Sequence, residues 1–317
     1  MKTRLEFQEK LLVKKANEEE FTASSLINEQ KDEIKAQTVE EFYSTLIVDL
    51  KEKGQVGTSY AYLNSYRMLK NFNKGQKLNY TFSHISVSFC RKFEEWLRAR
   101  GNKDITISYQ FRTLRAAFNR AIEAKIVSRD KNPFVEFKLS HLNTKTMKRA
   151  LSKKDILRIM QTDYSDCKPI RQLAQELFAF SNLCGGISFV DIANLTPSNI
   201  IDNRLIYQRQ KTHGGINLQL SSEAKKLIEK YADYQRVADY LFPILLYKRH
   251  ITPMQKTNRT HKVCHQVNRE LRALGKELRI SAEVTTYIAQ HSFSTHYIDS
   301  NLDYKTVSIL LGHSNIR

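Results

Sequence analysis

The sequence predicts a mainly α-helical protein of two domains, the second of which contains one small antiparallel β-sheet. A chain of 317 residues, 41% of them hydrophobic, has room for two cores. Apolar residues recur at intervals of three and four through most of the chain, which is the period of an amphipathic helix. Two strand-like stretches, 200–209 and 216–220, flank a turn in which Gly214 and Gly215 suit a β-hairpin.

The first part of the chain predicts a small helical bundle. Residues 1–38 are rich in Glu and Lys and indicate a solvated helix or linker. Residues 39–137 carry four apolar helical patterns, and Asn132-Pro133 is expected to end the bundle. Gly54 and Gly57 are expected to end the first helix, with Thr58 capping the second. Such periodicity is common to any four-helix bundle and identifies no function by itself.

A basic linker, 138–150, is expected to join the bundle to a second domain, 151–317. Residues 138–154 carry six Lys or Arg and no acidic residue, which is typical either of a solvated linker or of a segment that crosses a DNA backbone. In the second domain, Ser152 is expected to cap a helix together with Asp155, and Ser222 to cap another. A helix is predicted from Pro169 to about Leu183. Further helices are expected over 255–279 and from 285 onward, interrupted by turns.

The charge balance indicates a polyanionic partner. The formal net charge is +18, and an excess of this size favours nucleic acid. The four cysteines are far apart and form no Cys-x-x-Cys pair, so neither a zinc ribbon nor a disulfide framework is expected. His261 and His265 have a spacing that can bind metal, but no neighbouring ligand completes a site, so no metal or cofactor is expected. No apolar stretch predicts a membrane span or a signal peptide, and a cytoplasmic location is expected.

Four short motifs follow one another in the chain. The first box, 185–195, is Gly-Gly-Ile-Ser-Phe-Val-Asp-Ile-Ala-Asn-Leu, and the lysine motif, 207–212, is Tyr-Gln-Arg-Gln-Lys-Thr. The second box, 287–295, is Tyr-Ile-Ala-Gln-His-Ser-Phe-Ser-Thr, and the third box, 310–314, is Leu-Leu-Gly-His-Ser. In this order and spacing they resemble the active-site boxes of the tyrosine recombinases, the phage integrase family. The first box is most similar to the integrases of Bacteroidetes mobile elements.

The resemblance implies a SAM-like core-binding domain over 39–137, followed by a tyrosine-recombinase catalytic domain over 151–317. It implies site-specific cutting and rejoining of double-stranded DNA through a 3′-phosphotyrosyl intermediate, with no metal or nucleotide. The two domains would then close around the duplex as a clamp. An arm-binding domain, which often precedes the bundle in this family, is not expected here.

The resemblance also assigns roles to individual residues. Lys211 matches the general acid, and His313 matches the histidine that binds the phosphate. Ser188 and Gln290 occupy the places where the family usually has arginines, Tyr287 replaces the first histidine of the second box, and His291 matches the second, as a packed support. Losing one preorganised charged donor costs about 2.7–4 kcal/mol of barrier, so weak or absent catalysis is expected. The resemblance requires Ser188, Lys211, Gln290, His291 and His313 to converge on one surface.

The family's nucleophilic tyrosine lies about one helix after the third box, and the sequence stops first. We therefore expect the chain to be C-terminally truncated, to lack its nucleophile and to be inactive as it stands. Tyr297 and Tyr304 precede the third box and are not expected to replace that nucleophile. The alternatives are a non-catalytic DNA-binding homologue that occupies recombination sites, and a basic helical transcription regulator.

Double-stranded DNA is the expected partner. A tetramer on DNA is implied by the resemblance, and a monomer is expected off DNA. The predicted DNA-binding residues are basic side chains of the bundle, the linker and the helix over 255–279: Arg112, Arg115, Lys145, Lys148, Arg149, Lys262, Arg269 and Arg272.

Overall fold

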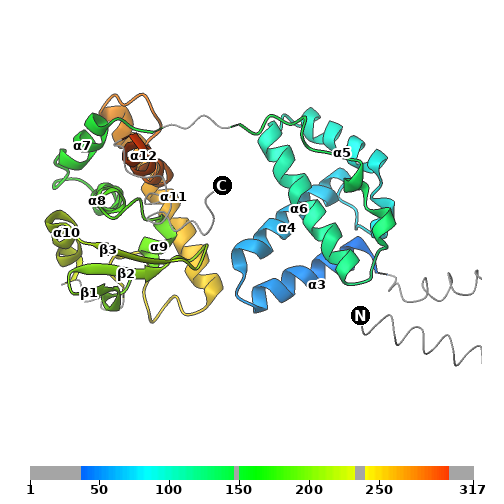
Figure 1. The fold of residues 1–317 in the computed structure, drawn as a ribbon, viewed down its shortest axis with the longest axis horizontal. Coiled ribbons are helices and arrows are strands. Elements are labelled where there is room, and N and C mark those ends of the chain that lie inside the picture. Colours follow the sequence, from blue (N-terminus) through cyan, green and yellow to red (C-terminus); the bar gives the residue numbers. More distant parts are fainter. Residues whose placement is uncertain (1–36, 146–149, 233–239, 300–317) are drawn as a thin grey trace, which may run out of the picture. The chain divides into compact units, whose positions relative to one another are not determined.

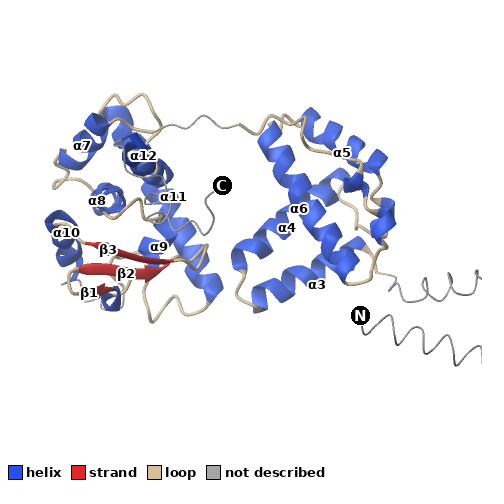
Figure 2. Cartoon of the chain, viewed as in Figure 1, coloured by secondary structure: helices blue, strands red, loops and turns tan. Residues whose placement is uncertain are grey.

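The computed structural model describes residues 37–145, 150–232 and 240–299. The chain divides after Lys145 into two compact units, each with its own hydrophobic core (Figure 1). Helices dominate both units, and the only strands of the described residues form one small sheet in the second unit (Figure 2). The predicted fold class, mainly α with a small antiparallel sheet, is confirmed.

The first unit is built from four α-helices: α3 (Val39–Glu52), α4 (Val56–Phe72), α5 (Val87–Ala99) and α6 (Asp104–Glu123). Short 3-10 helices follow α4 and α6: η1 (Phe82–His84), η2 (Arg129–Lys131) and η3 (Pro133–Val135). Aromatic side chains fill the core, because each helix turns a face of large apolar residues inward; Tyr43, Phe93, Phe111 and Phe118 are fully buried. The expected cap at Thr58 is wrong, because α4 begins at Val56 and Thr58 lies within it. The N-cap residue is Gln55, which makes no side-chain capping hydrogen bond.

Helix α8 (Pro169–Leu183) lies at the centre of the second unit and matches the predicted helix. Before α8 comes α7 (Lys153–Gln161), which begins at Ser152 as predicted, with the Ser152 hydroxyl accepting from the Asp155 amide. The other helices are α9 (Phe189–Asn194), η4 (Pro197–Asn199), α10 (Ser222–Ala232), α11 (Pro253–Glu277) and α12 (Thr286–Asp299). Helices α7, α9, α10, α11 and α12 pack against α8. The cap of α10 is Ser221, which accepts from the Ala224 amide, and not the predicted Ser222.

The sheet has the strand order β1 (Ile200–Ile201), β2 (Arg204–Gln208) and β3 (Gly215–Gln219), all antiparallel. The predicted strand over 200–209 is split, because Asp202 and Asn203 adopt left-handed backbone angles and form a tight turn. In the second turn the left-handed residue is His213, with φ +55°, and neither Gly214 nor Gly215 has positive φ. The predicted hairpin is present, but its glycines do not supply the left-handed position.

No helix within the described ranges is long and apolar enough to cross a membrane. All four cysteines are free thiols, and burial raises the pKa of Cys184 to about 12.

Candidate functional site

The first box begins with a loop whose backbone conformation is readily adopted only by glycine. Gly185 and Gly186 both have left-handed backbone angles, with φ +73° and +71°. The chain then enters α9 at Ser188, whose hydroxyl accepts from the Asp191 amide at 3.2 Å and donates to the Asp191 carboxylate at 2.7 Å. A hydroxyl has one proton to donate, so the donor capacity of Ser188 is used within the first box.

Asp191 joins the first box to the lysine motif. Its side chain is 4% exposed, and Oδ1 accepts from the Gln210 amide at 2.8 Å. Its Oδ2 lies 3.6 Å from Nε of Arg209, whose side chain is also buried. The backbone of Arg209 closes the turn, since its amide donates to the Gly214 carbonyl and its own carbonyl accepts from the His213 amide. One buried carboxylate therefore fixes α9 and the β2–β3 turn to each other.

Lys211 lies on this turn, directly after Gln210, and is exposed. Its position is held by the backbone bonds at Arg209 and Gln210 and leaves the amine open to a ligand. The pKa of the nearby Tyr207 phenol is raised, first by its burial and then by the Asp191 carboxylate. Tyr207 is therefore a core residue of the sheet with its proton retained.

The second box packs onto the glycine loop of the first. A Cβ atom at Gly186 would lie 3.1 Å from the Gln290 carbonyl oxygen and 3.3 Å from Phe293 Cβ, so α12 approaches the loop as closely as its backbone allows. A Cβ atom at Gly185 would meet Phe293 and Leu218 of β3 at ordinary contact distance. The first box, the hairpin and the second box are remote from one another in sequence and thus meet at this loop.

The other predicted site residues of α12 differ in exposure. Gln290 and His291 are half-buried, whereas Tyr287 is 66% exposed. The Tyr287 and His291 rings meet edge to face with centroids 4.3 Å apart. Next to them, the buried Ser292 hydroxyl accepts from the Leu151 amide at 2.9 Å and anchors the start of the second unit to α12. His313, Tyr304 and the third box lie outside the described residues, as does the side chain of Tyr297.

Arg209 is the residue that the sequence analysis missed. Its place two residues before Lys211 is visible in the lysine motif, but its pairing with Asp191 depends on the packing of α9 against the turn. A guanidinium suits phosphate oxygens. A guanidinium is therefore present beside the first box, but it is buried and its charge is balanced by the Asp191 carboxylate.

Most of the predicted DNA-binding residues lie on exposed surfaces of one unit or the other. Arg112 and Arg115 are exposed on α6, and Lys262 is exposed on α11. Arg269 and Arg272 of α11 are also exposed but have carboxylate neighbours, Glu270 at 3.3 Å and Glu283. Lys148 and Arg149 lie outside the residues whose side chains the structure describes.

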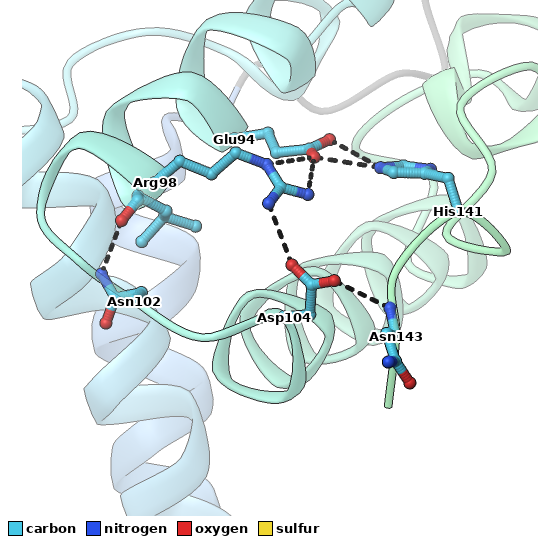
Figure 3. A network of polar contacts seen from close by, with 7 residues as sticks. Glu94, Arg98, Asn102, Asp104, His141 and Asn143 are labelled. Atoms are coloured by element: carbon cyan, nitrogen blue, oxygen red, sulfur yellow. Dashed lines mark hydrogen bonds and ion pairs between the residues drawn. The ribbon is translucent and has the colours of Figure 1, made fainter. Parts of the chain in front are cut away.

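The first part of the predicted linker is folded onto the first unit. Leu142 is buried in the core of that unit, so 138–145 packs on the first unit although most of its side chains are exposed. Figure 3 shows how two carboxylates hold this segment. His141 Nε2 lies 3.0 Å from Glu94 Oε1, and the Asn143 amide donates to Asp104 Oδ2 at 2.8 Å.

Arg98 ties these two carboxylates together. It donates to Glu94 through Nε and Nη2, and to Asp104 through Nη1 at 2.9 Å (Figure 3). The pKa of Asp104 is lowered, chiefly by the hydrogen bond from the Asn143 amide and also by Arg98. Lys145 follows as an exposed residue at the end of this segment.

No cluster of three or more His, Cys, Asp or Glu able to hold a metal ion occurs among the residues described. His261 and His265 are both exposed on α11. Among the predicted site residues, Lys211, Gln290 and His291 carry an amine, an amide and an imidazole, which are suited to binding an oxyanion such as a phosphate diester.

Two family models match the chain. The family model of the phage integrase SAM-like domain matches residues 38–139, and the model of the phage integrase family matches residues 149–317. A search of curated proteins found no match.

Several solved structures share the fold. The integrase of transposon Tn1549, in complex with transposon right-end DNA, is 16% identical, with a TM-score of 0.61 over 88% of this chain and 92% of that chain. A lambda integrase dimer bound to a COC′ core site is 18% identical, with a TM-score of 0.60 over 88% of this chain and 96% of that one. A lambda integrase tetramer bound to a Holliday junction is 16% identical, with a TM-score of 0.56 over 98% and 88%.

Proposed function

This chain belongs to the phage integrase family, and we propose that it binds double-stranded DNA as a site-specific recombinase that cuts and rejoins strands through a 3′-phosphotyrosyl intermediate. The observation that supports this most is the meeting of the first box, the lysine motif and the second box around Gly185, Gly186 and Asp191. A packing accident would not be expected to bring together the three segments that the family uses for chemistry.

In this proposal each group acts on the scissile phosphate. Lys211, exposed on a turn that Asp191 fixes, protonates the leaving 5′-oxygen. Arg209, buried and paired with Asp191, holds the turn that carries Lys211, and His291 supports the phosphate-binding surface. His313 would hydrogen-bond the phosphate, as the third box implies. No metal or nucleotide enters the reaction.

A second candidate function is a DNA-binding homologue that occupies recombination sites without cutting them. Two observations favour it. The hydroxyl proton of Ser188 is donated to Asp191, and Gln290 brings no charge to the place where the family usually has an arginine. The two candidates share the DNA site and differ in the chemistry that follows binding.

The remaining proposals follow from the family. The exposed arginines of α6 and the basic residues of α11 would contact one duplex from the two units, which would close as a clamp, and binding would weaken steeply with salt. Assembly into a tetramer on DNA, a monomeric state off DNA and a cytoplasmic location are also proposed. The sequence of the first box, with serine at position 188, supports an origin in a Bacteroidetes mobile element.

The substitution Gln290→Arg tests the assignment of the site. An arginine there should tighten binding to duplex DNA by about 1.5–3 kcal/mol, the scale of hydrogen bonds to a charged group. The matched control is Gln161→Arg, which adds the same charge at the exposed end of α7. Equal gains from the two variants, or no gain from Gln290→Arg, would show that position 290 does not face the phosphate.

Strand cleavage separates the two candidates. A nicked duplex, selected for binding from a random library, is incubated with the chain and analysed under denaturing conditions. A covalent protein–DNA band, formed by the chain or by the chain extended with any in-frame residues encoded after Arg317, supports the recombinase. Tight binding without a band in both forms supports the non-catalytic homologue, because the nucleophile of the family is expected after the third box.

A further inference from the structure

The turn that precedes α11 exposes two large apolar side chains together with two cations. Tyr247 is 65% exposed and Ile251 is 70% exposed, the largest value among the exposed large hydrophobic residues of the described chain. Lys248 and Arg249, between them, are also exposed. Single exposed apolar residues are ordinary, but two of them beside two cations on one short turn form a patch with the composition of a binding surface.

The turn is held by its own hydrogen bonds. The Leu246 carbonyl accepts from the amides of Arg249, at 3.1 Å, and His250, at 2.8 Å. The Leu246 amide donates to Nδ1 of the buried His250 at 2.9 Å. Burial is the main cause that lowers the pKa of His250, with help from Arg259 and Arg249, and this keeps Nδ1 available as an acceptor at neutral pH.

Both ends of the turn are also fixed to their surroundings. On one side, Arg259 of α11 donates from Nε to the Ile244 carbonyl at 3.0 Å, where Ile244 is fully buried. On the other, the amides of Ile251 and Thr252 donate to the Gln255 side chain at 2.9 and 3.0 Å. The exposed side chains are thus carried on a preorganised backbone, which lowers the ordering cost of binding a partner.

The exposed face of α11 continues from this turn. Gln255, Asn258, Lys262, His265 and Arg269 are exposed and follow one another at intervals of three or four residues, so they lie on one face of the helix. The face is polar and basic, and the chain as a whole carries a net charge of +18. A polyanion is the partner that matches this charge.

We propose that the turn over 246–251 is a sequence-discriminating contact with duplex DNA, in which Tyr247 and Ile251 touch base edges in a groove and Lys248 and Arg249 bind the flanking phosphates. The proposal rests on the proposed DNA-binding function and adds a place where base sequence is recognised. Apolar side chains can contact the thymine methyl group, which phosphate-binding cations cannot distinguish. A short rigid turn at the start of a basic helix presents both kinds of contact together.

The test begins with the 317-residue chain and a library of duplexes, each about three helical turns long, with a randomised centre. Selection defines the preferred sequence, and affinities are then measured for the selected and an unselected duplex. The variant Tyr247→Ala/Ile251→Ala should lower the ratio of the two affinities by about tenfold, within the range of base discrimination by good contacts. Its binding to the unselected duplex should stay unchanged.

Three further variants make the result specific. The pair Lys248→Gln/Arg249→Gln should weaken binding to both duplexes equally and reduce the slope of log K against log salt by about 1 for each phosphate that is no longer bound. The conservative pair Tyr247→Phe/Ile251→Val should keep the preference. Leu157→Ala, which removes a 52% exposed side chain from α7, is the matched control and should change neither affinity.

The outcomes separate this proposal from the function on which it rests. If the native chain shows no salt-dependent duplex binding, the proposed function fails. If the native chain binds and selects a sequence, but Tyr247→Ala/Ile251→Ala keeps the same preference and fold, the proposal is wrong. Loss of self-association in that variant, measured by sedimentation without DNA and with the base preference unchanged, would instead identify the turn as a protein interface.

Discussion

Replacing Asp191 by alanine should destabilise the second unit far more than replacing any exposed carboxylate. The Asp191 side chain is 4% exposed and serves three partners: the Ser188 hydroxyl at 2.7 Å, the Gln210 amide at 2.8 Å and the Arg209 guanidinium at 3.6 Å. Alanine would leave the buried Arg209 without its counter-charge. Removing one partner of a buried pair costs about 3–5 kcal/mol, because the other charge remains desolvated.

The chain contains a matched control. Asp155 occupies the same place in a Ser-x-x-Asp start, with the Ser152 hydroxyl 2.7 Å from Oδ2 and Arg158 Nη1 3.2 Å from Oδ1. Its pair is much more exposed, with side-chain exposures of 41% for Arg158 and 26% for Asp155. Exposed pairs contribute about 0.2–1 kcal/mol, so Asp155→Ala should cost about 1 kcal/mol or less. Asp191→Asn, which keeps one acceptor oxygen, should fall between the two alanine variants.

The measurement is urea unfolding followed by far-ultraviolet circular dichroism and by tryptophan fluorescence. The only tryptophan, Trp96, lies in the first unit, so its transition should not move in any of these variants. Hydrogen exchange should also quicken at the β2–β3 turn in Asp191→Ala, since the carboxylate holds the Gln210 amide. If Asp191→Ala lowers the free energy of unfolding no more than Asp155→Ala does, burial of the Asp191–Arg209 pair does not stabilise this site, and the reasoning is refuted.

Two further changes test the packing of each unit. Gly186→Ala should lower the free energy of unfolding of the second unit by about 1–3 kcal/mol, from left-handed backbone strain plus the close approach to the Gln290 carbonyl. Gly101→Ala, in the first unit, has the same strain with open space around it. When each variant is compared with the native transition of its own unit, the larger free-energy loss of Gly186→Ala reports the close approach, and equal losses would contradict it. Asp104→Asn should speed exchange of the Asn143 amide, which it now binds at 2.8 Å, while the amides of the sheet keep their rates; an unchanged Asn143 rate would show that Asp104 does not anchor this segment.

Local signals in the sequence predict an element correctly where its structure depends only on residues within that segment. The helix from Pro169 to Leu183 and the cap at Ser152 are predicted with the correct residues, because apolar period and capping chemistry act within a few positions. The same locality explains the errors at Thr58, at Ser222 and at the glycines of the β2–β3 turn. Ser221 caps the helix in place of Ser222, His213 takes the left-handed position of the turn, and α4 begins after Gln55 without a side-chain cap.

The predicted linker shows that a pattern of charges does not predict how a segment packs. Its lysines are typical of a solvated linker or of a segment that crosses a DNA backbone, and they do not predict that 138–145 packs on the first unit. It does so because Leu142 is buried and because Glu94 and Asp104 hold His141 and Asn143. These carboxylates lie 47 and 39 residues away along the chain. Charge composition does not reveal such partners.

The sequence by itself determined the helical class, the four boxes and the family to which they belong, since each is encoded within short segments. The tertiary structure alone decided that Asp191 pairs with Arg209 and that Gly186 lies against Gln290. Each of these contacts joins segments that are remote in sequence or depends on the burial that such contacts create. Their energies come from desolvation and close packing, which exist only once α9, the β2–β3 turn and α12 have come together.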